Sequence, residues 1–151
     1  MEQAIIEAKR ALAIGEVPIG AIIVKDEVVI GQGYNQRESL QDPTAHAEII
    51  AIKQAARTLG TWRLTGADLY VTLEPCPMCA GAIVNARLQQ VVFGAYDLKA
   101  GAVSSLMNIV EDKRLNHCVQ VMAGICEEAC SQLLKDFFQD LRTRNIYNSE
   151  R

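Results

Sequence analysis

The sequence predicts an α/β protein built on one mixed sheet of five strands. Short runs rich in Val and Ile alternate with stretches of helical periodicity along the whole chain. Two of the early runs are separated only by residues 25–27, which predicts an antiparallel hairpin. A later pair of runs is separated by a segment long enough for a helix, which predicts a right-handed parallel crossover. Antiparallel and parallel pairs in one chain make the sheet mixed.

Length and composition indicate one globular domain over residues 1–151. Half of the 151 residues are hydrophobic and 22% are charged, which suits a chain with a core of its own rather than a disordered one. No apolar run approaches the roughly 18 residues of a membrane span, and the N-terminus does not resemble a signal peptide. We therefore expect a cytoplasmic protein without a membrane partner, whose five cysteines are reduced. The net charge of −3 gives no general attraction to nucleic acid, so RNA contacts would need local clusters of Lys and Arg.

The first elements follow from apolar periodicity and from glycine. Apolar residues at helical spacing predict a first helix, and Gly15 ends it. Aliphatic runs predict strands over 19–24 and 28–34. Gly31 and Gly33 form a G-x-G pair, which alone is a weak nucleotide-binding signal. We interpret them as bulge or close-packing glycines.

The middle of the chain predicts a helix, a strand and a second helix. The helix over 44–59 starts at Thr44, whose hydroxyl is a candidate N-cap. The apolar run over 69–73 reads as a buried strand. The next helix starts at Pro77, because proline at the first helical position needs no backbone N–H, and it runs to about residue 87.

The last third predicts strands over 90–94 and 119–122 and an amphipathic helix over 125–142. We expect one apolar stripe on this helix to enter the core: Cys126, Ala129, Cys130, Leu133, Leu134, Phe137 and Leu141. The stripe's cysteines could form a second metal site with His117 and Cys118, but core packing is the preferred interpretation. Trp62 and Phe137 are likewise expected to pack rather than to stack on bases, whereas Phe138 falls at the edge of the stripe.

A candidate metal site combines Cys76 and Cys79 with His46. The C-x-x-C pair lies at a strand-to-helix junction, where the helix N-terminus lowers thiol pKa and favours metal-binding thiolates. Alone, this pair could be a redox dithiol or half of a zinc ribbon, and a lone histidine in a first helical turn is more often a capping or core residue. Together they supply three ligands of a tetrahedral zinc and leave the fourth position for water, the pattern of a catalytic zinc. Glu48 lies two residues from His46, close enough to approach that water without being a ligand.

The joint pattern H-x-E and P-C-x-x-C is typical of zinc deaminases. Longer stretches carry the likeness over nearly the whole chain: 16–21, 42–49, 69–76, 92–95 and 97–106. The sequence resembles the bacterial tRNA-specific adenosine deaminases of the cytidine/deoxycytidylate deaminase superfamily. The resemblance implies a three-layer α/β/α cytidine-deaminase-like fold with helices on both faces of the sheet, one Zn²⁺ per chain and a homodimer. Tyr96 departs from it, since some relatives carry a smaller or basic residue there.

The implied reaction is hydrolytic deamination of adenosine to inosine at the wobble position of a tRNA anticodon. Zinc makes hydroxide available near neutral pH, and this hydroxide attacks C6 of the base. Glu48 acts as the proton shuttle from the water to the ring nitrogen and the leaving ammonia. The metal site alone does not distinguish adenine from cytosine. The alternative is therefore a zinc deaminase of a free base or nucleotide, such as cytosine, guanine or deoxycytidylate.

The resemblance also implies substrate contacts and partners. The family's substrate loops correspond to Asn35, Asp97 and Lys99, which are candidates for binding an anticodon stem-loop. Basic residues near the C-terminus are candidate backbone contacts: Arg142, Arg144 and Arg151. A dimer would fit the apolar face of the 77–87 helix (Ala82, Ile83 and Ala86), although this face could equally pack on the chain's own sheet. A non-enzymatic zinc module is the more distant alternative and would need a fourth protein ligand.

Overall fold

The computed structural model describes the backbone of residues 1–149 and the side chains of residues 1–144. Its centre is a five-stranded sheet in the order β2-β1-β3-β4-β5. β1 is antiparallel to both β2 and β3, whereas β3, β4 and β5 are parallel. The mixed sheet expected from the sequence is therefore confirmed. The elements are α1 (Glu2–Ala13), β1 (Gly20–Lys25), β2 (Val28–Tyr34), α2 (Ala47–Leu59), β3 (Asp68–Leu73), α3 (Pro77–Asn85), β4 (Gln90–Ala95), β5 (Gln120–Met122) and α4 (Glu127–Ser149).

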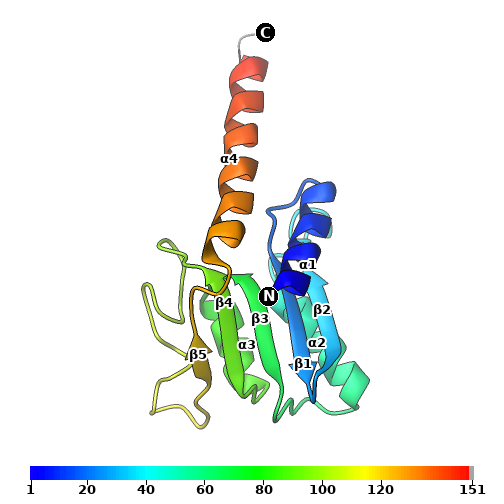
Figure 1. Ribbon diagram of the computed structural model, residues 1–151, viewed down its shortest axis with the longest axis vertical. Coiled ribbons are helices and arrows are strands. Elements are labelled where there is room, and N and C mark those ends of the chain that lie inside the picture. Colours follow the sequence, from blue (N-terminus) through cyan, green and yellow to red (C-terminus); the bar gives the residue numbers. More distant parts are fainter. Residues whose placement is uncertain (150–151) are drawn as a thin grey trace.

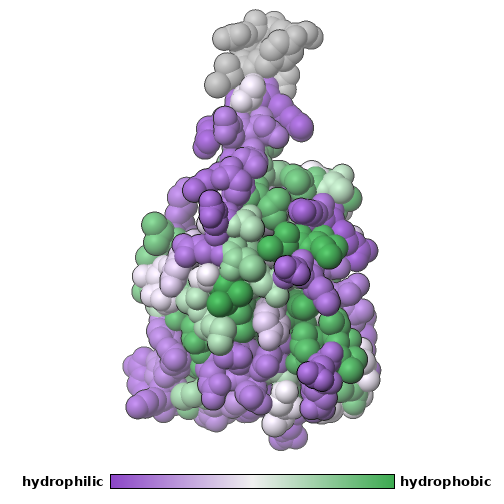
Figure 2. Space-filling view, viewed as in Figure 1, coloured by the Kyte–Doolittle hydropathy of each residue, from purple (hydrophilic) through white to green (hydrophobic). Residues whose placement is uncertain are grey.

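Helices cover both faces of the sheet, as the resemblance implied. α2 and α3 lie together on one face, and α1 and α4 lie on the other, where α4 projects well beyond the sheet (Figure 1). The projecting part of α4 is hydrophilic, whereas apolar side chains gather lower on the molecule (Figure 2). The core lies chiefly between the sheet and the α2/α3 layer. None of the described helices is long and apolar enough to cross a bilayer.

Two glycines of β2 bring α2 against the sheet. A Cβ atom at Gly31 would overlap the backbone carbonyl of Ala51, and one at Gly33 would crowd the backbone of Ala47. The close-packing interpretation of these glycines is confirmed. Because side chains are absent there, the start of α2 lies directly over the strand, which sets the position of the residues at its N-terminus.

The β1–β2 turn is shorter than expected. Lys25 pairs with Val28 and is still part of β1, so the turn consists of Asp26 and Glu27 alone. Both have positive φ, at 49° and 63°, as a two-residue type I′ hairpin requires.

The predicted start of the second helix was wrong by three residues. Thr44 does not cap it, because its hydroxyl and its N–H both donate to Asp42 at 2.7 and 2.8 Å. This local turn holds the chain out of the helix until Ala47, and His46 is the N-cap residue, with extended backbone. His46 therefore precedes the first turn rather than lying within it. The predicted end is confirmed, since Gly60 closes α2 in a left-handed conformation with φ 67°.

The expected apolar stripe of the last helix enters the core only in part. Cys130 is buried, and a Cβ atom at Gly94 of β4 would overlap its sulfur, so its core role is confirmed. Cys126 is exposed and precedes α4 with φ 56°, so its expected place in the core was wrong. Cys118 is exposed as well. All five cysteines are free in the structure.

The packing expectation for Trp62 was also wrong. Trp62 is 54% exposed and contacts the guanidinium groups of Arg63 and Arg87, because the loop after α2 carries it outside the core. Of the two alternatives for the apolar face of the 77–87 segment, packing in the chain's own core holds, since Ile83 of α3 and Ala86 directly after it are buried at 0% and 6% exposure. They therefore give no support to a dimer interface.

Candidate active site

The three candidate metal ligands come together at the N-termini of two helices. His46 is the N-cap residue of α2, Cys76 is the N-cap residue of α3, and Cys79 lies in the first turn of α3. The His46 Nδ1 atom lies 3.7 Å from the Cys76 sulfur and 3.6 Å from the Cys79 sulfur. Both helix N-termini carry partial positive charge, which favours thiolates at this point.

This donor set fits a zinc ion. Zinc is held tetrahedrally at roughly 2.0–2.1 Å from nitrogen and about 2.3 Å from sulfur, which places nitrogen and sulfur donors about 3.6 Å apart. The observed separations of 3.6 and 3.7 Å match that requirement. Among the described residues, His46, Cys76 and Cys79 form a group whose ligand atoms all lie within 4.8 Å of one another, and this group contains no fourth ligand. Three protein ligands are typical of catalytic rather than structural zinc.

The two thiols have different acidities without the metal. Hydrogen bonding from Cys79, together with His46, lowers the pKa of Cys76 to about 4. The same hydrogen bond and burial raise the pKa of Cys79. The contact with Cys76 also raises the pKa of His46. Because zinc binds thiolates, metal binding has to remove the proton that these contacts hold on Cys79.

Glu48 has the environment of a proton-transfer group. It is the second residue of α2 and is only 4% exposed, and burial raises its pKa to about 7. A carboxyl with a pKa near neutrality can both accept and donate a proton at physiological pH. His46, Glu48 and Cys76 line one pocket, so the carboxyl and two of the three candidate metal ligands face a common space, whereas Cys79 is buried.

This pocket has a volume of about 280 Å³ and is walled by six separate parts of the chain. Of the three candidate substrate contacts, Asn35 and Asp97 line the pocket and the exposed Lys99 does not. The pocket is completed by residues that sequence reasoning did not assign to it: Val17, Ile19, Arg37, Ala47, Leu73, Glu74, Ala100 and Phe138. Phe138 could have been suspected from its place beside, rather than on, the apolar stripe of α4. The other residues carry no comparable signal.

The Asn35 side chain is held in place by the loop before β1. Its amide nitrogen donates to the Val17 carbonyl at 3.3 Å and to Glu16 at 3.4 Å, and its oxygen accepts from the Arg37 N–H at 3.2 Å. Glu16 also accepts the N–H of Ser39 at 2.6 Å. This network joins the segments on either side of the hairpin and fixes one wall of the pocket.

A second buried carboxylate, Glu74, organises the opposite wall. It directly precedes Pro75 and accepts backbone N–H groups from the loop after β4, namely those of Asp97, Val103, Ser104 and Ser105. Asp97 in turn accepts the N–H groups of Lys99 and Ala100 at 2.9 and 3.1 Å. Sequence reasoning did not single out Glu74, because a glutamate before a proline carries no pattern of its own.

The fold and the site together define a deaminase. The MafB19-like deaminase family model matches residues 1–142. A solved structure from work on A-to-I editing by tRNA:A34 deaminases at the wobble position is 46% identical, with a TM-score of 0.85, over 89% of this chain and 97% of that one. The guanine deaminase of Bacillus subtilis is 43% identical with a TM-score of 0.61, over 63% of this chain and 61% of that one.

Curated relatives indicate which kind of deaminase this chain resembles. The tRNA-specific adenosine deaminase of Bacillus subtilis is 51% identical over 144 residues, which is 95% of this chain and 89% of the relative. This chain belongs to the tRNA-specific adenosine deaminase family.

Proposed function

We propose that this protein deaminates adenosine to inosine at the wobble position of a tRNA anticodon. The observation that carries the proposal is the juxtaposition of a His/Cys/Cys donor set with a buried carboxyl in one pocket, in a chain of this family. His46, Cys76 and Cys79 hold one Zn²⁺ per chain. When bound, zinc supplies a water whose pKa falls from 15.7 to about 7.

Glu48 moves the protons of the reaction. Its carboxylate accepts a proton from the attacking water and donates it to N1 of the adenine ring, and a second transfer lets the amino group leave as ammonia. A pKa of about 7 suits both directions of transfer. Burial of Glu48 keeps bulk water from competing for these protons. Asn35 and Asp97 are proposed to position the nucleotide from opposite walls of the pocket.

The RNA partner is an anticodon stem-loop, whose bases are already partly unstacked, so that drawing one into a pocket costs less than in a duplex. Lys99 lies outside the pocket and is exposed, so we propose it as a contact to RNA outside the target nucleotide. Arg142 and Arg144 are exposed on α4 and can serve the same purpose, whereas Arg151 lies outside the described residues. We also propose that the protein is a homodimer and that it acts in the cytoplasm.

An inosine assay tests this function. Purified protein is given an anticodon stem-loop with adenosine at the wobble position, and separately free adenosine, cytidine and guanine, while zinc is quantified in the same preparation. Inosine in the stem-loop with one zinc per chain supports the whole proposal. Deamination of a free base or nucleoside alone would overturn the tRNA assignment and keep the metal site. The likeness to a guanine deaminase makes guanine the most informative of the free substrates.

A further inference from the structure

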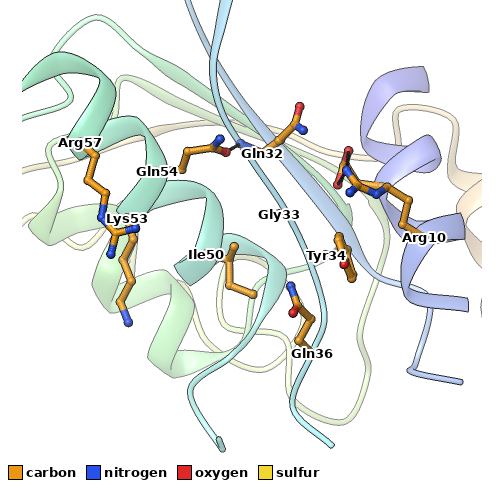
Figure 3. Close-up of a pocket in the computed structure, with 10 residues that line it drawn as sticks. Arg10, Gln32, Gly33, Tyr34, Gln36, Ile50, Lys53, Gln54 and Arg57 are labelled. Atoms are coloured by element: carbon orange, nitrogen blue, oxygen red, sulfur yellow. Dashed lines mark hydrogen bonds and ion pairs between the residues drawn. The ribbon is translucent and has the colours of Figure 1, made fainter. Parts of the chain in front are cut away.

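A second pocket lies outside the active site, at the free edge of the sheet. It has a volume of about 370 Å³ and wraps around the edge strand β2, between α1 on one face and α2 on the other (Figure 3). Three basic residues line it, Arg10 of α1 on one side of β2 and Lys53 and Arg57 of α2 on the other side, where their side chains run next to each other along the helix (Figure 3). The metal ligands and Glu48 do not line it, so the proposed chemistry leaves this pocket unexplained.

The pocket is basic although the chain is acidic overall. Three cations line it against one carboxylate, Glu7, in a protein of net charge −3. Glu7 is already paired with Arg10 at 3.1 Å, and the Arg10 guanidinium also lies 5.0 Å from the centre of the Tyr34 ring. Lys53 and Arg57 form no ion pair among the described residues. Within the part of the chain that the structure describes, these two positive charges on one helix therefore have no carboxylate at salt-bridge distance.

The segment at the end of β2 and helix α2 contribute residues to both the active-site pocket and the basic pocket. At the end of β2, Asn35 and Arg37 line the active site, whereas Tyr34 and Gln36 line the basic pocket. The start of α2 lines the active site, and the next turns of the same helix line the basic pocket. At about 1.5 Å per residue, Lys53 and Arg57 lie roughly 10 and 16 Å along α2 from His46. The basic pocket is thus a direct continuation of the active-site wall.

We propose that this basic pocket binds backbone phosphates of the RNA substrate, next to the nucleotide whose base enters the active site. The inference rests on the proposed function for the nature of the substrate. The segment 34–37 and α2 run from the active site to Lys53 and Arg57, so an RNA that follows this wall from the active site meets the two cations. Phosphate contacts of this kind set the position of the RNA without reading its sequence.

The test measures binding of the anticodon stem-loop as a function of salt. Replacing both free cations (Lys53→Ala with Arg57→Ala) removes two phosphate contacts, so the slope of log K against log [salt] falls in magnitude by about 1 for each cation. KM for the stem-loop rises in the same variant. The charge-reversed pair (Lys53→Glu with Arg57→Glu) changes both quantities further in the same direction. All four substitutions are at exposed positions, and thermal unfolding checks that the fold is retained.

A charge-matched control removes two lysines elsewhere. Lys25 ends β1 at the end of the sheet opposite the active site, and Lys113 is exposed in the loop before β5. The Lys25→Ala, Lys113→Ala variant has the same net charge and is expected to keep the wild-type slope and KM. An equal loss of slope in both double variants would overturn the proposal, because it would show a general charge effect. An unchanged slope in the Lys53, Arg57 variant would overturn it as well.

The experiment on the basic pocket can fail without contradicting the proposed function, and the reverse is also true. Binding and its salt slope are measured at equilibrium and do not depend on turnover. A wild-type protein that binds the stem-loop but makes no inosine would contradict the proposed function, whereas inosine formation with an unaltered slope in the Lys53, Arg57 variant would contradict only the phosphate site.

Discussion

The carboxylate of Glu74 is bonded to both the backbone and the side chain of Ser105. Its Oε1 atom accepts the Ser105 N–H at 2.8 Å, and its Oε2 atom accepts the Ser105 hydroxyl. Burial raises the pKa of Glu74, but the hydrogen bonds from Ser105 and its neighbours outweigh this effect and hold the pKa below the ordinary value. Since Glu74 lies two residues before Cys76, this interaction ties the loop after β4 to the start of the metal-binding helix.

Replacing Glu74 by Gln should loosen this loop. The amide keeps the size of the side chain but turns one acceptor oxygen into a donor, which then faces backbone N–H groups. Hydrogen bonds to a charged group are worth about 1.5–3 kcal/mol, so we expect Glu74→Gln to lower the free energy of unfolding by about 2 kcal/mol or more. Urea unfolding measures this, with the exposed Glu27→Gln as control. A variant as stable as wild type would show that the carboxylate's charge contributes little.

The loop also depends on Gly101. A Cβ atom at this position would overlap the Glu74 carboxylate. We expect Gly101→Ala to destabilise the protein by roughly 1–3 kcal/mol, the usual cost of overpacking, and to raise KM because Asp97 moves with the loop. Gly81 in α3 is the matched control, since its Cβ would meet open space and alanine is the better helix former by about 1 kcal/mol. Equal effects of the two substitutions would contradict the steric explanation.

Glu48→Gln tests the assigned proton transfer. The amide is close to isosteric but cannot accept a proton, so turnover should fall by about 10²–10⁴, the usual contribution of general acid–base catalysis. Zinc content should stay at one per chain, because Glu48 is not part of the donor group. Inosine formation and metal content are measured on the same sample. Near wild-type activity in the zinc-loaded variant would remove Glu48 from the mechanism.

Removing the metal should cost stability as well as activity. The ligands come from two helices, so a bound ion links α2 to α3. A ligand present at 100 times its dissociation constant stabilises the native state by about 2.7 kcal/mol. We expect a chelator to lower the melting temperature and added zinc to restore it. A Cys79→Ser variant, which lacks one thiolate, should show little response to zinc, and a wild-type-like response would contradict the ligand assignment.

Much of the fold was readable from local sequence because local rules decide it. Gly60 ends α2 since glycine readily adopts the left-handed conformation, and Pro77 starts α3 since its missing N–H is not needed there. The predictions that failed did so because a competing local interaction or backbone conformation, which the residue pattern does not reveal, decided the structure. Thr44 is a good N-cap by type, but Asp42 binds both its hydroxyl and its N–H. Cys126 has the spacing of the stripe, but a left-handed backbone places it before the helix.

The residues of the proposed chemistry could be identified from the sequence itself. His46, Glu48, Cys76 and Cys79 are of the residue types that a zinc-dependent proton transfer needs, and their spacing places each pair at a helix start. Tertiary structure alone decided what surrounds them. Three features depend on segments far apart in the chain: the hydrogen bonds between Glu74 and Ser105, the contribution of Phe138 to the active-site pocket, and the basic pocket with Lys53 and Arg57. Local spacing specifies which residues share a helix, but only packing of the helices on the sheet specifies which helices and loops meet.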